Sequence, residues 1–304
     1  MKNYYHIYYL IKRFIPRQMQ LSLRRKLLFR KIGKYVNEWP INYRASSLPE
    51  GWTGWPDGKQ FAFVLTHDVD TQRGHDRCIQ LAEIEEKLGF RSSFNFVVDD
   101  YTVSSEVRRE LVSRGFEVGV HGLTHNASLY RSRSEFQKQA ERINQILKEW
   151  NAIGFRSPCM YRNLEWLSIL DIAYDASTFD TDPFEPQPDG VETIFPFLVQ
   201  FANGQKGYIE LPYTLPQDFT LFVLMQEPDI GIWVKKLDWI AGHGGMALMN
   251  VHPDYLNFSG HKNLEEYPVS YYQDFLEHML QKYQNKYWHV LPKEMAYFWK
   301  TKTC

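Results

Sequence analysis

Residues 61–70 read FAFVLTHDVD, an apolar run that ends abruptly in ionisable residues, among them Asp68 and Asp70. β-Branched and aromatic residues of this kind favour a buried strand. The same pattern, an apolar segment that ends in a chemically active side chain, recurs before His121, Arg156 and His252. Because the loops that leave the carboxyl ends of parallel strands share one face of a (β/α) barrel, we expect these side chains to meet on that face.

Strand and helix patterns alternate from residue 61 onward, which indicates a parallel α/β sheet. We expect strands at 61–69, 92–98, 116–121, 153–157, 246–252 and 287–291. We expect helices at 73–89, 104–114, 133–150, 163–173, 231–241 and 270–285, and a last helix after Pro292. The proline-rich stretch at about 175–216 breaks the alternation, so we interpret it as an insertion on the barrel face, with short strands at 192–197 and 207–212.

The amino-terminal region differs in charge from the rest of the chain. Residues 1–45 hold eleven Lys or Arg and one acidic residue, Glu38, which gives +10, and the whole chain has a net charge of −1. We expect a basic, helical extension over 1–45, an ordered connector rich in Pro, Gly and Trp over 46–60, and the barrel over 61–304. The extension can lie on an anionic membrane or pack on the acidic barrel, and both alternatives remain open.

Composition limits the classes of partner and compartment. The near-neutral charge gives no bulk attraction to nucleic acid. Three widely spaced cysteines match no zinc or redox spacing, which favours a reduced, cytoplasmic compartment. We find no membrane-spanning stretch and no secretory signal, so we expect a cytoplasmic protein, with peripheral contact at the inner face of the membrane as an option.

Asp68 and Asp70 are two residues apart, so on a regular strand their carboxylates point the same way. Such a pair can divide its roles, with one carboxylate binding a cation and the other moving a proton. The alternative is a helix cap followed by a solvated loop residue. His121 and His125 have i, i+4 spacing, and with a carboxylate from a neighbouring strand they make a two-His, one-Asp metal set with open coordination positions. Alone, such a histidine pair is more often a surface or packing pair.

Two further strand ends add charge to the expected site. Arg156 can hold Asp68 ionised and oriented, and a purely structural ion pair is the alternative. His252 ends a strongly apolar strand and can act as an acid or base, or can be a satisfied core histidine.

In this order, these residues resemble the motifs of the polysaccharide deacetylase family (carbohydrate esterase family 4). Asp68 falls on the family's catalytic base, and Asp70 provides the D-x-D variant of its first motif. The segment from His121 to His125 matches the spacing of the H-[ST]-x-x-H motif. Arg156-Ser157-Pro158 matches the R-x-P-Y motif, with Cys159 in place of tyrosine.

The resemblance covers about residues 60–290 and implies a distorted (β/α) barrel of about seven strands. It implies that Asp68 is the base, that Arg156 holds this base, and that His252 is the acid. In the family an aspartate orients the acid, and Asp175 or Asp180 is the candidate here. The implied ligands of Zn²⁺, or of another divalent metal, are Asp70, His121 and His125.

We therefore expect a metal-dependent amide hydrolase that removes N-acetyl groups from an amino-sugar glycan or its precursor. Two alternatives remain at this point: hydrolysis of small linear or cyclic amides on the same fold, and a catalytically inert barrel that binds glycan or acts as a scaffold. The expected partner is accordingly an N-acetylated glycan or a small amide.

Overall fold

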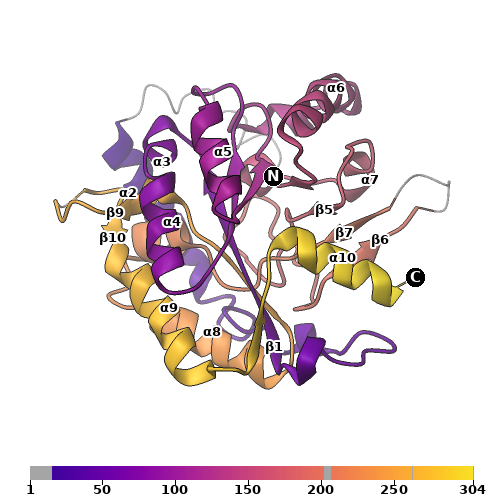
Figure 1. The fold of residues 1–304 in the computed structure, drawn as a ribbon. Helices are drawn as coiled ribbons and strands as arrows, with labels where there is room; N and C mark the ends of the chain where they lie inside the picture. The colour runs from indigo at the N-terminus through magenta and orange to yellow at the C-terminus, as the bar shows by residue number, and fades with distance from the viewer. Residues whose placement is uncertain (1–15, 202–206, 262, 304) are drawn as a thin grey trace.

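A computed structural model describes residues 16–201, 207–261 and 263–303, and its centre is a curled sheet of parallel strands surrounded by helices (Figure 1). The barrel strands are β1 (Phe61–Val69), β2 (Ser93–Phe96), β3 (Glu117–Val120), β4 (Gly154–Phe155), β5 (Tyr174–Asp175), β7 (Tyr208–Glu210) and β8 (Met246–Asn250). Their pairing runs β8-β1-β2-β3-β4-β5-β7, all parallel. The backbone N–H groups of Thr214 and Leu215, beyond β7, donate to the Leu248 carbonyl in β8 at 3.0 and 3.1 Å. These bonds bring the two ends of the sheet together, and the prediction of a distorted barrel of about seven strands is confirmed.

Two short strands extend this sheet. β11 (Tyr287–His289) pairs with the first residues of β1, and β6 (Phe197–Val199) runs antiparallel to β7. A separate pair is formed by β9 (Leu256–Asn257) and β10 (Tyr267–Pro268). The stretch predicted as an insertion therefore supplies β7 and the closing segment to the barrel itself. Only the loop between β5 and β7 interrupts the alternation of strands and helices. Within this loop, β6 begins at Phe197, later than the strand expected at 192–197.

Helices follow the strands around the outside. They are α3 (Gln72–His75), α4 (Cys78–Lys87), α5 (Ser105–Ser113), α6 (Arg133–Trp150), α7 (Leu164–Leu167), α8 (Gly231–Gly242), α9 (Val269–Tyr283) and α10 (Pro292–Thr303). The helix expected at 163–173 is only one turn long, because Leu170 and Ile172 pack into a hydrophobic cluster beyond its end. The helix expected at 73–89 is divided into α3 and α4.

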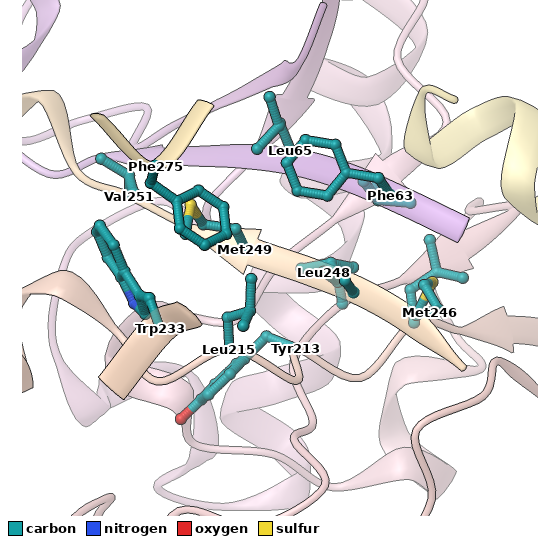
Figure 2. Packing of buried hydrophobic residues seen from close by; sticks show 14 of the residues in the cluster. Phe63, Leu65, Tyr213, Leu215, Trp233, Met246, Leu248, Met249, Val251 and Phe275 are labelled. Atoms are coloured by element: carbon teal, nitrogen blue, oxygen red, sulfur yellow. The ribbon is translucent and has the colours of Figure 1, made fainter. Parts of the chain in front are cut away.

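The core lies between β1, β8 and the helices behind them (Figure 2). Every residue of β1 is buried, which explains why its first five residues, FAFVL, are continuously apolar rather than alternating. Phe63 and Leu65 of β1 lie near Met249 of β8 and Phe275 of α9 in this cluster. Each fully buried side chain of this size contributes about 1.5–3 kcal/mol of transfer free energy, so the strands that carry the site are firmly held.

The described part of the basic extension is α2 (Arg17–Ile32), and the expected helix before residue 16 lies outside the described residues. This helix packs against a π-helix, η6 (Phe219–Met225), through buried Leu21 and Leu28. Arg25 also donates to the Val223 carbonyl at 3.2 and 2.8 Å. In the connector, Trp55 is buried and donates to the Gly244 carbonyl at 2.7 Å. Throughout the described ranges, the helices are too short or too polar to traverse a bilayer.

Candidate active site

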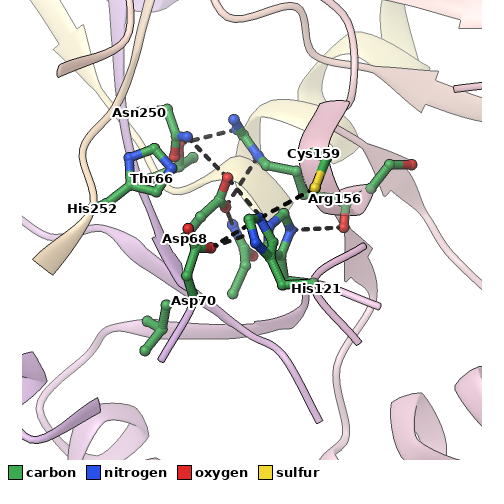
Figure 3. A network of polar contacts seen from close by, with 12 residues as sticks. Thr66, Asp68, Asp70, His121, Arg156, Cys159, Asn250 and His252 are labelled. Atoms are coloured by element: carbon green, nitrogen blue, oxygen red, sulfur yellow. Dashed lines mark hydrogen bonds and ion pairs between the residues drawn. The ribbon is translucent and has the colours of Figure 1, made fainter. Parts of the chain in front are cut away.

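A cavity of about 920 Å³ opens at the carboxyl ends of the barrel strands. It is lined by the residues expected there and by a wall of α2, and the polar contacts at its base are shown in Figure 3. The expected site residues on its surface are Asp68, Asp70, His121, His125, Cys159 and His252. Arg156 lies behind them and is fully buried.

Asp68 is held by donors on both of its carboxylate oxygens. Asn95 of β2 donates to Oδ1 at 3.2 Å and Asn250 of β8 donates to Oδ2 at 2.9 Å. The Arg156 Nε atom lies 3.4 Å from Oδ1. Burial alone raises the pKa of Asp68, but Arg156, the neighbouring histidines and Asn95 outweigh it and hold this pKa well below its ordinary value. Asp68 is therefore an oriented, ionised carboxylate.

Arg156 is fixed by the strand ends around it. Its Nη2 donates to the Thr66 hydroxyl at 3.0 Å, and this hydroxyl donates to the Met249 carbonyl at 2.9 Å. A guanidinium without solvent contact stays in place only when a carboxylate faces it. Arg156 and Asp68 thus form one buried unit at the base of the cavity.

Asp70, His121 and His125 present three ligand atoms to one point, all within 4.8 Å of one another. The Asp70 Oδ1 atom lies 3.5 Å from His121 Nε2 and 3.4 Å from His125 Nε2. Tetrahedral ligands that are each about 2.0–2.1 Å from a zinc ion lie about 3.3–3.4 Å apart. Within the described residues, this buried Oδ1 has no hydrogen-bond partner. Since an unsatisfied buried carboxylate oxygen is costly, the set fits a divalent cation.

Outer contacts fix the ligands. The His121 Nδ1 donates to the Arg156 carbonyl at 3.0 Å, which leaves Nε2 as the atom that can bind a metal. Burial lowers the pKa of His121 against the opposing effect of Asp68 and Asp70, and this favours the neutral imidazole that a metal requires. The Asp70 N–H donates to Asp254 Oδ2 at 3.0 Å, and the Tyr255 hydroxyl lies 3.4 Å from Asp70 Oδ2.

His252 is oriented by Asp218, which the sequence analysis did not identify. The His252 Nδ1 lies 2.7 Å from Asp218 Oδ1, and the His252 N–H donates to Asp218 Oδ2 at 2.9 Å. The Phe219 N–H and the Tyr267 hydroxyl also donate to this carboxylate, at 2.8 and 3.1 Å. Burial by itself lowers the pKa of His252, but Asp218 and the nearby aspartates raise it to about 10. The histidine is therefore protonated at neutral pH.

The expectation that Asp175 or Asp180 orients His252 is wrong. Asp175 accepts from the Ser177 hydroxyl and N–H at 2.7 and 2.9 Å, so it shapes the turn after β5. Asp180 pairs with the buried Lys236 ammonium at 2.5 Å. Both carboxylates are committed to partners away from His252, whereas Asp218 lies directly before η6, beside the end of β8.

Sequence reasoning also missed Asn95, Asn250 and Asp254. Asn95 stands between two phenylalanines in SFNF, and Asn250 is the one polar residue of MALMN, so each interrupts an apolar strand pattern. A Cβ at Gly119 would overlap with the Asn95 side chain, so the glycine in β3 provides the space that lets Asn95 reach Asp68.

The departures from the family motifs have local reasons. Gly122 has φ +71°, and a Cβ there would overlap with Pro158, so the glycine permits close contact between two motif loops. Cys159 has φ 55°, and its Sγ lies 3.8 Å from His125 Nε2. Its thiol therefore stands beside the metal set, where the family has a tyrosine.

These strands, loops and side chains define a (β/α) barrel of the polysaccharide deacetylase type. Residues 57–162 match the model of the polysaccharide deacetylase family, a range that includes both aspartates, both histidines and Arg156. No curated protein matches the sequence.

Solved structures share this fold. A protein assigned to the polysaccharide deacetylases from Mycobacterium smegmatis is 17% identical, with a TM-score of 0.65 over 84% of this chain and 96% of that chain. A second, from Pseudomonas aeruginosa PAO1, is 13% identical, with a TM-score of 0.61 over 81% and 93%. PuuE allantoinase is 13% identical, with a TM-score of 0.63 over 87% and 98%. At these identities the likeness establishes the fold.

Proposed function

We propose that this chain is a metal-dependent amide hydrolase that removes N-acetyl groups from an amino-sugar glycan or its precursor. One observation carries the proposal: the unsatisfied Asp70 Oδ1 beside two imidazole nitrogens, with the separately held carboxylate of Asp68 next to it. The match of residues 57–162 to the polysaccharide deacetylase family supports the choice of an acetylated glycan as the substrate class.

The proposed ligands are Asp70, His121 and His125, and the donor set of two nitrogens and one oxygen suits Zn²⁺ or another first-row divalent ion. A bound ion of this kind supplies Lewis-acid polarisation of an amide carbonyl and a lowered pKa for water. The metal content of the purified protein identifies which ion is bound.

Asp68 is the proposed base. Its lowered pKa keeps it ionised, and Asn95 and Asn250 direct its lone pairs, so it can accept a proton from the attacking water. Arg156 holds the carboxylate in place without reaching the cavity surface itself.

His252 is the proposed acid. Its Nδ1 is engaged with Asp218, so its Nε2 is the atom free to donate a proton to the leaving amine. A pKa of about 10 keeps that proton on the ring until the amine develops basicity. The backbone N–H of Cys159 is the proposed donor to the oxyanion that develops when water adds to the amide carbonyl.

Acetate release tests the proposal. The purified chain, loaded with Zn²⁺, is assayed on N-acetylated oligosaccharides with and without a chelator, beside the Asp68→Asn variant. We expect release that the chelator abolishes, that added Zn²⁺ restores and that the variant lacks. Metal-loaded protein that releases no acetate from any of these sugars would contradict the proposal and favour an inert glycan-binding barrel.

The shared fold with PuuE allantoinase favours small amides as the second candidate substrate class. Adding linear and cyclic amides to the same screen separates the two classes by kcat/KM. For the compartment, the wide cysteine spacing supports a reduced, cytoplasmic location, which cell fractionation tests.

A further inference from the structure

One wall of the catalytic cavity is formed by α2, the basic helix that precedes the barrel. Leu23, Leu27 and Leu28 of this helix line the same cavity as Asp68 and His252. Leu28 is buried against the protein, but Leu23 and Leu27 are 46% and 49% exposed. Two half-exposed leucines at the opening of an active site offer apolar surface to a ligand.

Further apolar side chains line the same cavity. They are Phe184 and Pro186 from the loop between β5 and β7, and Phe219 and Leu224 from η6, which packs against α2. A sugar ring alone does not require this much apolar surface. The cavity therefore fits a ligand with an apolar portion beyond the reacting group.

Cations stand among these apolar side chains. The Arg24 guanidinium lies 4.6 Å from the centre of the Phe219 ring, and Lys31, about two turns further along the same face of α2, also lines the cavity. Among residues 16–201, 207–261 and 263–303, no carboxylate forms an ion pair with Arg24, whereas Arg17 pairs with Glu265. Arg24 is thus a cation at the cavity that can bind an anionic group of a ligand.

Glu185 is the carboxyl group whose charge Arg24 affects in this region. Burial, with a further contribution from Asp182, raises the pKa of Glu185 to about 8 against the opposing effect of Arg24. At neutral pH Glu185 is therefore mostly uncharged and leaves the guanidinium available. The Gln217 amide donates to Glu185 Oε1 at 2.7 Å, which places two polar groups suited to sugar hydroxyls beside the cation.

We propose, on the basis of the proposed function, that the substrate is an N-acylated amino sugar linked through a phosphate to an apolar chain. The sugar lies at the metal set and His252, the phosphate contacts Arg24 and Lys31, and the chain runs along Leu23 and Leu27. Guanidinium and ammonium groups are the usual protein partners of phosphate, and leucine side chains favour burial of an apolar chain beside them.

Four matched substrates test this assignment with the full chain loaded with Zn²⁺. They are N-acetylglucosamine, its 1-phosphate, its farnesyl glycoside and its farnesyl phosphodiester, each kept below its micelle concentration. Acetate release and equilibrium binding are both measured. We expect the phosphodiester to have a kcat/KM at least 100-fold above that of the free sugar, and a clear advantage over both singly modified compounds. Equal values for the phosphodiester and either singly modified compound would overturn the assignment.

Variants on the same helix supply matched controls. Arg24→Gln and Leu27→Ser should each remove most of the phosphodiester advantage, measured as the ratio of kcat/KM for the phosphodiester to kcat/KM for the free sugar. Arg30→Gln and Phe29→Ser change another arginine and another apolar side chain at exposed positions of α2 that do not line the cavity, and these variants should retain the advantage. Equal losses in all four variants, matched by equal losses in binding to phosphatidylglycerol vesicles, would indicate general membrane contact of the basic helix and would refute a specific subsite.

The binding measurement separates failure of this inference from failure of the proposed function. Release of acetate from oligosaccharides without a phosphodiester advantage overturns only the inference. Tight, Arg24-dependent binding of the phosphodiester without acetate release from any compound supports the subsite and overturns the hydrolase.

Discussion

Asp218 Oδ1 lies 2.7 Å from His252 Nδ1, and the same carboxylate accepts three further hydrogen bonds, so the acid of the proposed reaction has a fixed tautomer and direction. Since the carboxylate raises the pKa of His252 to about 10 against burial, His252 is protonated below that pH and loses its proton above it. Asp218→Asn should move the alkaline limb of the kcat profile toward the ordinary histidine pKa of about 6.5 and lower kcat by about 10- to 100-fold. A pH series of acetate release checks this. An unchanged alkaline limb would remove Asp218 from this role.

A variant of Asn95 tests the role of Asp68 as the base through the acid limb of the pH–activity profile. Its hydrogen bond helps to hold the pKa of Asp68 below its ordinary value, so activity should fall only when the pH drops through that lowered pKa. Asn95→Leu removes a hydrogen bond to a charged group, worth about 1.5–3 kcal/mol, and should move the acid limb upward by about one to two pH units. Activity well above the limb should be largely retained. A uniform loss at every pH, with no movement of the limb, would point to a packing defect instead.

Gly74 tests how the metal ligand Asp70 is supported. A Cβ at position 74 would overlap with the Asp254 carboxylate, which accepts the Asp70 N–H at 3.0 Å. Gly74→Ala should therefore displace Asp254 and lower zinc affinity by about 10- to 100-fold, as loss of an outer contact to a ligand typically does. Competition with a chromophoric chelator measures it. Gly242→Ala is the matched control, since nothing lies within 4 Å of a Cβ at that position; equal affinities in the two variants would contradict the prediction.

The buried pair of His67 and Glu85 contributes to stability rather than to chemistry. The Glu85 Oε1 lies 2.7 Å from His67 Nε2, and Ser92 donates to Oε2 at 2.6 Å. Although burial raises the pKa of Glu85, His67 and the hydrogen bonds lower it overall. Glu85→Gln should reduce the free energy of unfolding by about 2–4 kcal/mol. Its neighbour provides the comparison: Glu86→Gln breaks only surface contacts to Arg114 and Arg91 and should cost about 1 kcal/mol or less. Denaturant titration of both variants decides, and similar costs would count against the buried pair.

The fold was predictable where local sequence patterns and tertiary packing favour the same structure. The helix expected at 133–150 matches α6 because Ser132 caps its first turn and Asn151 adopts the left-handed conformation that ends it. β1 matches its prediction because its burial on both faces requires a continuous apolar run. The stretch from 175 to 216 was harder, since β7 is three residues long and its place in the sheet depends on pairing with distant β5.

The candidate site was likewise predictable only in part. Asp68, Asp70, His121, Arg156 and His252 follow apolar strands, so topology alone brings them to one face. Asp218 lies in an irregular segment with no periodic signal, and its partner becomes evident only when η6 packs beside β8.

The central claim is that the D-x-D segment divides its labour, with Asp70 as ligand and Asp68 as base. The zinc content of two purified variants, Asp68→Asn and Asp70→Ala, tests it most directly, measured beside the wild type after equilibration with the metal. We predict that Asp68→Asn retains stoichiometric zinc but releases acetate very slowly, because asparagine keeps the shape of the side chain and cannot accept the proton. Asp70→Ala should lose zinc, with activity partly restored by excess metal. Loss of zinc from Asp68→Asn with retention by Asp70→Ala would reverse the two roles, and a wild type that binds no divalent metal would contradict the account.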